Sequence, residues 1–383
     1  MDKRIIPLAL GALGIGTTEF VIMGLLPDVA ASLHISIPQA GHLISAYALG
    51  VVVGAPVLIA YAAKFPPKKI LAFLMMAFIL FNALSALVSD YYTMLVVRFL
   101  SGLPHGAFFG VGTVVATRLA KPGKQAQSIA MMFTGLTLAN LAMVPFVTWL
   151  GHQLSWRYAF GVVAVLGVLT LIGLKFLLPY MDSLRTTTLK DELEFFRSAK
   201  AWHIIAITGI GFGGLFAWFS YITPLMTHVS LFRTDSIAYI MVLAGAGMVV
   251  GNFLGGIMAD RMRPALAAAI LLGAMILALI LVFFFSGYQS VSLVLTFVCG
   301  ALSMAVGTPV NIIMLRSAKN SEMMASAFMQ AAFNVGNSLG ALFGGLPLEL
   351  GLSYNYPSLV GAGLAGIGLL LCLSFIRKYK QVI

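Results

Sequence analysis

Long apolar runs separated by short polar breaks dominate the chain. Each run extends over about 20 residues, the length that an α-helix needs to cross a hydrocarbon core of about 30 Å. Strands of a membrane barrel would instead alternate in polarity over about 10 residues. The pattern therefore predicts an all-α membrane protein with twelve transmembrane helices. The predicted spans are residues 5–27, 40–62, 69–88, 92–117, 126–150, 156–178, 203–228, 236–258, 264–286, 289–314, 323–347 and 356–376.

Composition supports this fold class. Of the 383 residues, 60% are hydrophobic and only 9% are charged, and the mean hydropathy is +1.00. Soluble domains carry about 25% charged residues. A water-soluble chain of this size could not bury so much apolar surface, which excludes a cytosolic enzyme, a secreted domain and a disordered protein. Cys299 and Cys372 both lie inside apolar runs, so we expect no disulfide framework, no metal site and no cofactor.

The basic residues lie on one side of the predicted membrane. One set of loops, together with Lys175, holds 20 of the 23 Lys and Arg residues. The opposite loops hold only Arg157 and Arg233, and Arg98 lies inside a span. Because positively charged loops stay in the cytoplasm, both termini are expected there. The net charge of +11 then faces anionic lipid headgroups, and a nucleic-acid partner is not expected.

A polar stretch at 179–200 divides six spans from six. The motif Arg118-Leu-Ala-Lys121 after the fourth span is similar to Arg316-Ser-Ala-Lys319 after the tenth, 198 residues later. This repeat predicts two pseudo-symmetric six-helix bundles, 1–178 and 201–383, joined by a cytoplasmic linker at 179–200. Many secondary transporters are built in this way, with the substrate site between the halves near the midplane.

Only two charged residues lie deep inside predicted spans, Glu19 and Arg98. Counted from the ends of their spans, both lie about 9 Å from the outer face. Burial disfavours the charged form of a carboxyl group, whereas a nearby guanidinium favours it, so Glu19 could exchange a proton in the physiological range. A fixed ion pair that only orients two helices is the alternative.

Polar and aromatic side chains at mid-span are candidates for a substrate cavity. Any single one could equally be an interhelical hydrogen-bonding group, and this holds especially for the lone His105. The candidates are Thr18, Met23, Tyr47, His105, Phe109, Asn140, Phe212, Trp218, Tyr221, Asn311, Gln330 and Asn334, with Thr17, Asn252 and Asn337 as further mid-span polar residues. Glycines concentrate in the fourth, seventh, tenth and eleventh spans, where they permit close helix contact.

Residues 16–27 (GTTEFVIMGLLP) resemble the first-span signature of the twelve-span drug:proton antiporter family, within the major facilitator superfamily. Residues 98–110 (RFLSGLPHGAFFG) resemble the fourth-span motif of that family, whose arginine is implicated in proton transfer. The runs 101–112 and 216–221 are similar to the arabinose-efflux-permease (sugar efflux) branch. The resemblance implies a cavity lined by the first, fourth, seventh and tenth helices and halves that rock about it.

Two motifs depart from the family pattern. After the second span, Ala63 and Lys64 replace the aspartate and arginine of the cytoplasmic gating loop, whereas Asp260 and Arg261 retain them after the eighth span. The resemblance therefore implies gating at Asp260 and Arg261. In the fifth span Val144 replaces the glycine that the antiporter motif has before its proline.

Together these features predict a proton-coupled antiporter of the bacterial inner membrane. It would export a small organic solute, such as a drug, sugar or nucleoside, by alternating access, with Glu19 and Arg98 coupling protons to solute. We expect a monomer in the lipid bilayer, with the solute and protons as its partners. An importer or facilitator of the same fold remains the alternative. A membrane enzyme is not expected, since only His105 among the histidines lies deep, nor is a receptor.

Overall fold

The computed structural model describes residues 3–62, 65–183, 197–318 and 322–379, and this part of the chain forms helices without any strand. The first half contains α1 (Ile6–Gly24), α2 (Leu26–Ser32), α3 (Ile37–Ala62), α4 (Pro67–Leu87), α5 (Tyr91–Leu119), α6 (Gln125–Leu138), the π-helix η2 (Ala139–Met143), α7 (Val144–Gln153) and α8 (Trp156–Leu177). A short 3-10 turn, η1 (Lys3–Ile5), precedes α1.

The second half repeats this order. It contains α10 (Ala199–Gly211), α11 (Gly213–Phe219), α12 (Ile222–Pro224), the π-helix η4 (Leu225–Val229), the 3-10 turn η5 (Thr234–Ser236), α13 (Ile237–Arg261), α14 (Pro264–Phe285), α15 (Gln289–Ser317), α16 (Glu322–Glu349) and α17 (Tyr356–Lys378). The fifth span is thus α6, η2 and α7 in succession, and the seventh runs from α10 to η4.

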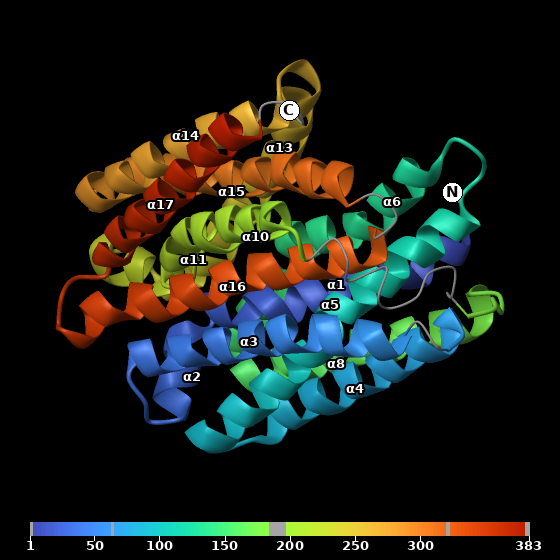
Figure 1. The fold of residues 1–383 in the computed structure, drawn as a ribbon. Helices are drawn as coiled ribbons and strands as arrows, with labels where there is room; N and C mark the ends of the chain where they lie inside the picture. Colours follow the sequence, from blue (N-terminus) through green and yellow to red (C-terminus); the bar gives the residue numbers. More distant parts are fainter. Residues whose placement is uncertain (1–2, 63–64, 184–196, 319–321, 380–383) are drawn as a thin grey trace.

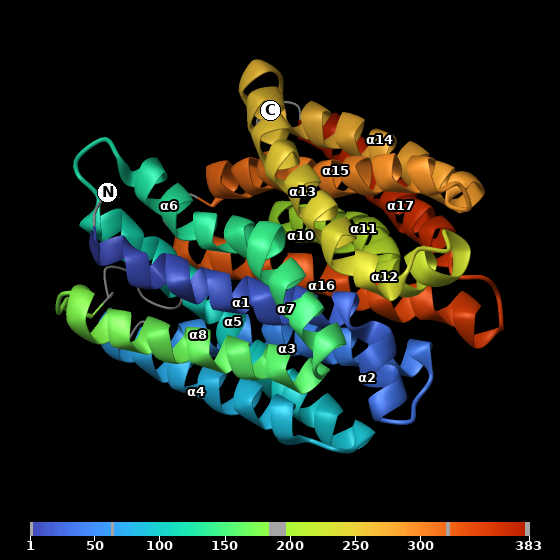
Figure 2. The same cartoon turned by 180° about the vertical axis from the view of Figure 1, so that it is seen from behind.

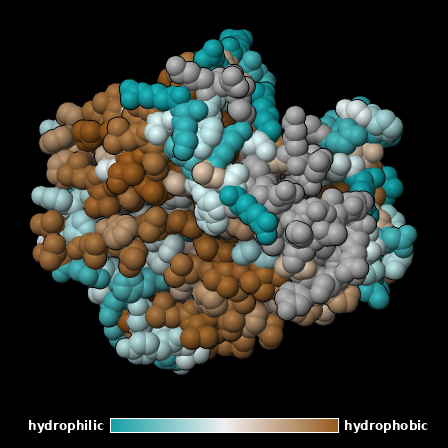
Figure 3. Space-filling model, viewed as in Figure 1, coloured by the Kyte–Doolittle hydropathy of each residue, from teal (hydrophilic) through white to brown (hydrophobic). Residues whose placement is uncertain are grey.

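The all-α membrane fold is confirmed. Eleven helical segments of the described chain are long and apolar enough to cross a membrane. The remaining span is α16, which has 28 residues and carries Gln330, Asn334 and Asn337 along its length. Apolar side chains such as Phe73, Leu87 and Phe253 point outward, and hydrophobic residues cover much of the left and lower centre of the visible face, with hydrophilic residues toward the right, at the top and at the lower left (Figure 3). This surface is suited to lipid.

The helices form two bundles that pack side by side (Figure 1). The contact between bundles is made by α3 and α5 against α16, and by η2 and α7 against α13. We call the end at which α3, α5, α13 and α15 finish the basic end, because it carries Arg118, Arg261 and Arg316. The opposite end, with α2 and residues 350–355, is the distal end. The basic ends of α6 and α13 lie apart in both views (Figures 1 and 2).

Glycines dock α3 directly against α5. Gly50 and Gly54 of α3 face the backbone oxygens of Phe99 and Leu103, and Gly102 of α5 faces that of Tyr47, so a Cβ at any of these glycines would overlap with the opposing backbone. Gly50 and Gly54 are four residues apart and therefore lie on one helix face, where they permit close backbone approach. This docking fixes the relative position of two helices that carry site residues.

Pro27 explains the break between α1 and α2. Proline has no backbone N–H, so the carbonyl of Met23 loses the partner that a continuous helix would supply. Residue 27 lies in the first turn of α2, where proline is tolerated. The break therefore leaves backbone oxygens available near the contact between the two bundles.

Candidate functional site

Arg98 is completely enclosed in the interior of the first bundle. Its Nη1 donates to the Thr18 hydroxyl at 3.0 Å and its Nη2 donates to the Thr18 carbonyl at 3.1 Å. The guanidinium carbon lies 4.4 Å from the ring centroid of Tyr47 and 5.3 Å from that of Phe160. Its Nε has no hydrogen-bond partner. Aromatic faces thus surround a cation that is only partly hydrogen-bonded.

Thr18 links this cation to α4. Its hydroxyl donates to Asn82 Oδ1 at 2.5 Å while it accepts from Arg98, and Asn82 Nδ2 donates to the Phe78 carbonyl at 2.8 Å. Thr18 and Asn82 are fully buried. The hydroxyl is therefore satisfied as donor and as acceptor, which fixes the position of α1 relative to α4 and α5.

Tyr47 and His105 form a second buried pair. The Tyr47 hydroxyl and His105 Nδ1 lie 3.0 Å apart, and both side chains are buried. The His105 ring in turn lies 5.3 Å from Phe109, which stacks on Phe133 at 5.1 Å. His105 is thus the partner of a tyrosine from a neighbouring helix.

Glu19 follows Thr18 on α1 and lies next to this cluster. Its carboxyl interacts electrostatically with Arg98 and Tyr47, and Asn334 and Asn337 of α16 face it from the second bundle. It forms no ion pair with Arg98: the described chain has no salt bridge between them, and the guanidinium bonds to Thr18 instead. About 6% of Glu19 stays accessible, whereas Arg98 is enclosed. The two charges are neighbours without being a bonded pair.

Several polar atoms around Glu19 lack hydrogen-bond partners. Both amide atoms of Asn337, and Asn334 Oδ1, are buried without a partner at hydrogen-bond distance, although both amides lie near enough to the Glu19 carboxyl to stabilise its charge. Asn334 Nδ2 donates to the Gln330 carbonyl at 3.0 Å. Because native proteins pair almost all buried polar groups, these amides make the surroundings of Glu19 the candidate site.

Beyond Glu19, the two bundles are joined at the distal end. The Thr223 hydroxyl donates to the Met23 carbonyl at 2.9 Å and lies 3.1 Å from that of Gly24. The Met23 oxygen has no helical donor, because Pro27 lacks the backbone N–H that would bond to it. The Ser45 hydroxyl donates to the Ser338 carbonyl at 3.1 Å, from α3 to α16. We call these hydroxyl-to-carbonyl bonds the distal contacts.

Aromatic rings fill the space between the distal contacts and Glu19. Phe20 stacks on Phe216 at 6.3 Å and meets Phe219 edge-on at 6.0 Å. The Tyr221 hydroxyl donates to the Ala341 carbonyl at 2.7 Å and lies against Gly41 of α3. Met23 and Tyr221, expected in the substrate cavity, therefore lie in the closed distal part of the contact between bundles.

The other expected cavity residues are distributed over both bundles. Phe212 meets Phe333 edge-on at 4.5 Å, next to Gly307. Trp218 is buried with its indole N–H unpaired. Asn140 bonds within its own helix, to the Leu136 carbonyl at 3.2 Å. Asn311 of α15 and Gln330 of α16 are half-buried.

The expected gating residues lie at the basic end of α13. Asp260 and Arg261 are exposed, and neither forms a salt bridge with a described residue. Ala63 and Lys64, where the first half departs from the gating pattern, lie outside the described residues.

Sequence reasoning did not single out Asn82 or Thr223. Asn82 is a lone amide in the otherwise apolar run at 69–88, which is a signal for interhelical hydrogen bonding. Thr223 gave no comparable signal, because its role depends on a carbonyl exposed in another helix.

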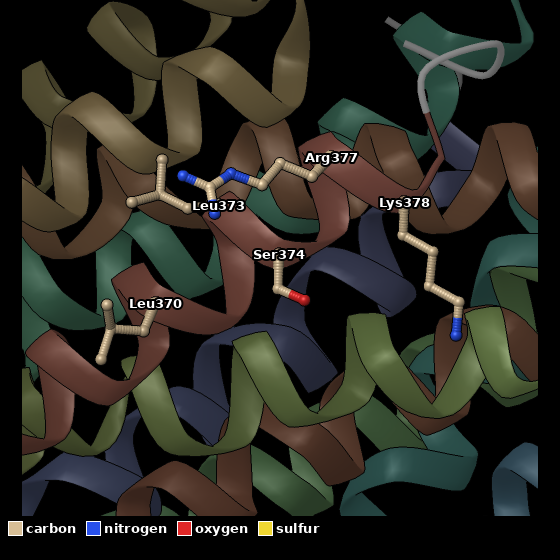
Figure 4. Close-up of a pocket in the computed structure, with 5 residues that line it drawn as sticks. All are labelled: Leu370, Leu373, Ser374, Arg377 and Lys378. Carbon is tan, nitrogen blue, oxygen red and sulfur yellow. The ribbon is translucent and has the colours of Figure 1, made fainter.

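A cavity of about 390 Å³ lies on α17, where Leu370, Leu373, Ser374, Arg377 and Lys378 line it (Figure 4). All five residues belong to one helix, and none contacts the Glu19 cluster. The described chain also contains no group of three or more His, Cys, Asp or Glu residues placed to hold a metal ion.

Two helical bundles around a buried polar cluster are the arrangement expected of a membrane carrier. A sequence model of the Major Facilitator Superfamily matches residues 8–323 and 234–382. The chain belongs to this superfamily, and it is a secondary transporter of small solutes rather than an enzyme.

Relatives and solved structures agree with this assignment. The chain is 41% identical to AraJ of Escherichia coli (strain K12) over 381 residues, which covers 100% of this chain and 96% of AraJ. It is 39% identical to the inner membrane transport protein YdhP of the same strain, with 100% and 98% covered. A "Probable sugar efflux transporter" of Helicobacter pylori (strain ATCC 700392 / 26695) is 32% identical, with 99% and 96% covered. Among solved structures, a D-xylose-proton symporter shares the fold with a TM-score of 0.77 at 16% identity, covering 97% of this chain and 96% of that one.

Proposed function

We propose that this transporter exports a small organic solute in exchange for protons across the inner membrane. The observation that carries the proposal is the buried carboxyl of Glu19, which lies beside a guanidinium without being bonded to it. A carboxylate locked in an ion pair would be held in one protonation state, whereas an unbonded one can gain and lose a proton.

The position of Glu19 between the bundles supports coupling of that proton to movement. Asn334 and Asn337 approach the carboxyl from α16 of the second half. Protonation removes the charge that these amides can stabilise, so it changes the free energy of contact between the two halves. Arg98 supplies the fixed positive charge against which Glu19 titrates.

An uneven distribution of contacts between the bundles supports alternating access. Three hydroxyl-to-carbonyl contacts join them at the distal end, whereas nearer the basic end the Thr113 and Ser326 hydroxyls lie 3.5 Å apart. The basic ends of α6 and α13 lie apart (Figure 1). We propose that bundles 1–178 and 201–383 rock so that the distal contacts break and the basic end closes near Asp260 and Arg261. The segment 179–200 links them.

We propose that the solute binds between Glu19 and the polar and aromatic residues of the second half. Asn334, with an unpaired amide oxygen, and Trp218, with an unpaired indole N–H, are the strongest candidates for direct contact. Phe212, Asn311 and Gln330 complete the proposed site. Relatives that include a "Probable sugar efflux transporter" favour a neutral, hydroxyl-bearing solute.

The proposed orientation places the basic end in the cytoplasm. The loops at this end hold most Lys and Arg residues, as cytoplasmic loops do. Lys68 donates to the Lys175 and Leu178 carbonyls near this end, at 2.8 and 2.5 Å. Both termini would then be cytoplasmic.

The test is transport by purified protein in liposomes with an imposed pH gradient. We would measure gradient-driven movement and gradient-free counterflow of radiolabelled L-arabinose, uridine and chloramphenicol. Glu19→Gln should abolish gradient-driven transport but retain counterflow, because the neutral amide mimics the protonated acid. Asp235→Asn, which changes an exposed carboxyl at the distal end of the second bundle, is the control. Full gradient-driven transport by Glu19→Gln would exclude the proposal, and uptake with the proton gradient would indicate a symporter.

A further inference from the structure

Tyr47 lies between the buried cation and a histidine that fixes its hydroxyl. Its ring faces the guanidinium of Arg98 at 4.4 Å, and its hydroxyl lies 3.0 Å from His105 Nδ1. Tyr47 itself is buried. One aromatic side chain from α3 therefore contacts two residues of α5 that are seven positions apart.

The surroundings hold this arrangement rigidly. Gly102 of α5 packs on the Tyr47 carbonyl, and Gly50 of α3 packs on that of Phe99, so the two backbones are in direct contact on either side of the ring. His105 is supported by Phe109 at 5.3 Å. The tyrosine ring has little freedom to turn away from the guanidinium.

The expected partner of the Arg98 guanidinium is the Glu19 carboxylate. A buried guanidinium and a buried carboxylate on neighbouring helices attract each other strongly, because little solvent screens them. Arg98 nevertheless uses its Nη atoms on Thr18, the residue directly before Glu19, and leaves Nε unpaired. Something must hold the planar group in this position rather than one residue further along α1.

We propose that Tyr47 is a positioning residue for Arg98, and that His105 acts through Tyr47. The ring holds the guanidinium on Thr18 and away from the Glu19 carboxyl, so that Glu19 stays free to exchange a proton. This inference rests on the proposed function, and it gives Tyr47 and His105 a role other than contact with the solute.

Four side chains of the described residues act on the Glu19 carboxyl. Arg98 of α5 and Tyr47 of α3 are the charged or titratable side chains that interact with it, and Asn334 and Asn337 contribute neutral amides from α16. The other described helices that contact α1, among them α6, α7, α8, α12 and α13, present no titratable group to this carboxyl.

The test measures protonation of Glu19 directly and needs no solute. Dicyclohexylcarbodiimide reacts with protonated carboxyl groups in apolar surroundings. Purified protein in detergent would be labelled across a pH series, and the adduct on the peptide containing Glu19 would be quantified by mass spectrometry. Glu19→Gln provides the background.

Removing the ring should have the largest effect. In Tyr47→Leu the guanidinium is released and pairs with the carboxylate, so half-maximal labelling should move to lower pH by about one unit, a tenfold change in proton binding. Tyr47→Phe keeps the ring and loses only the hydroxyl, so its shift should be several-fold smaller. If Tyr47→Leu is not monodisperse, Tyr47→Met is used in its place, because Met also lacks a ring and is close to Leu in volume.

His105 is tested by a double-mutant cycle. His105→Leu should give the same small shift as Tyr47→Phe, because both remove the same hydrogen bond, and the double variant should shift no further. His105→Gln, which can still bond to the hydroxyl, should restore the wild-type midpoint. Tyr92→Leu, at an exposed position on the same helix, should leave the labelling profile unchanged.

The outcomes separate the two proposals. If Glu19 of the wild-type protein is not labelled at any pH, the proposed function fails. If Glu19 is labelled but its midpoint is the same in Tyr47→Leu, Tyr47→Met and the wild type, the proton-exchange function stands and the positioning role is excluded. Additive shifts of Tyr47→Phe and His105→Leu would exclude the indirect role of His105.

Discussion

The helix pairs α3–α5 and α13–α15 occupy equivalent places in the two bundles, and their backbones dock in the same way. Gly50 and Gly54 of α3 correspond to Gly247 and Gly251 of α13, each 197 residues later, and all four pack on backbone oxygens of the partner helix. Gly102 corresponds to Gly300 at an offset of 198. The docking of the helices is repeated.

The side chains at the centre of the two pairs are not repeated. Arg98 corresponds to Thr296, whose hydroxyl donates to the Ser292 carbonyl of its own helix at 2.8 Å. Tyr47 corresponds to Ala244, and Asp90, which caps α5, corresponds to Tyr288. Among the described residues, the second pair has only a neutral side-chain bond, from the Thr308 hydroxyl to Asn252 Oδ1 at 3.1 Å, whereas the first holds a buried cation. The helices can therefore dock through their glycines whether or not the pair carries buried ionisable side chains.

The largest effects are expected where the two pairs are alike. Gly54→Ala and Gly251→Ala each place a Cβ against a backbone oxygen, so each should destabilise the protein by about 1–3 kcal/mol, measured as a lower melting temperature in detergent. Gly161→Ala and Gly256→Ala, where a Cβ meets nothing, should be neutral or stabilising. Loss of stability in only one bundle would contradict the equivalence.

The second prediction concerns the position where the pairs differ most. Arg98→Met should reduce gradient-driven transport at least tenfold, while the melting temperature changes little, because removing the desolvated cation offsets the loss of its two hydrogen bonds to Thr18. Thr296→Val should leave transport unchanged. Equal transport by both variants would mean that the charge has no role in coupling.

Two buried asparagines, Asn82 in the first bundle and Asn337 in the second, differ in their hydrogen bonding. Asn82 bonds to Thr18 and Phe78, so Asn82→Leu leaves the Thr18 hydroxyl without its acceptor and should cost about 1–3 kcal/mol. Asn337 has no partner at hydrogen-bond distance among the described residues and acts only on the Glu19 carboxyl, so Asn337→Leu should cost little stability and impair transport instead. Chemical denaturation and proteoliposome transport of the two variants would distinguish these outcomes, and a less stable Asn337→Leu would show that its amide is bonded after all.

The smallest effect is expected at the start of α5. The backbone N–H of Thr93 donates to the Asp90 carboxylate at 2.9 Å, which lowers the pKa of Asp90 below its ordinary 3.8. The hydrogen bond to the Asp90 carboxylate stabilises the folded protein above the unfolded-state pKa of Asp90. This stabilisation is lost as the pH falls through the lower pKa that Asp90 has in the folded protein. Asp90→Ala should therefore melt slightly lower than wild type at neutral pH, with a difference that disappears below pH 3.8. Asp90→Asn, which keeps a capping oxygen, serves as the control.

Most of the fold could be predicted from the sequence because lipid imposes a simple rule on span length. The predicted span 264–286 corresponds to α14 (Pro264–Phe285), and 156–178 to α8 (Trp156–Leu177). The short helix α2 was not predicted, because the apolar run at 5–27 continues past Gly24 and conceals the break. The π-helices η2 and η4 likewise leave no signal in hydropathy.

The two buried charges of the candidate site could be predicted from the sequence, whereas Asn82, Thr223 and the hydrogen bonds could not. Buried charge pointed to Glu19 and Arg98, and their neighbourhood follows from span depth. That Arg98 bonds to Thr18 rather than to Glu19 depends on side-chain packing around the Tyr47 ring, which no spacing rule encodes. The grouping of Met23 with Thr223 depends on a contact between helices 200 residues apart.

The distal contacts are made by neutral hydroxyl groups and backbone oxygens, and the chargeable pair beside them, His42 of α3 and Glu349 of α16 at 3.9 Å, is partly exposed to solvent. Water can replace such bonds one at a time at small enthalpic loss, so the periplasmic side of the proposed carrier can open without separating buried ions. The opening rate should then depend weakly on ionic strength and more on how readily solvent wets the rings of Phe20, Phe216 and Phe219 as they part.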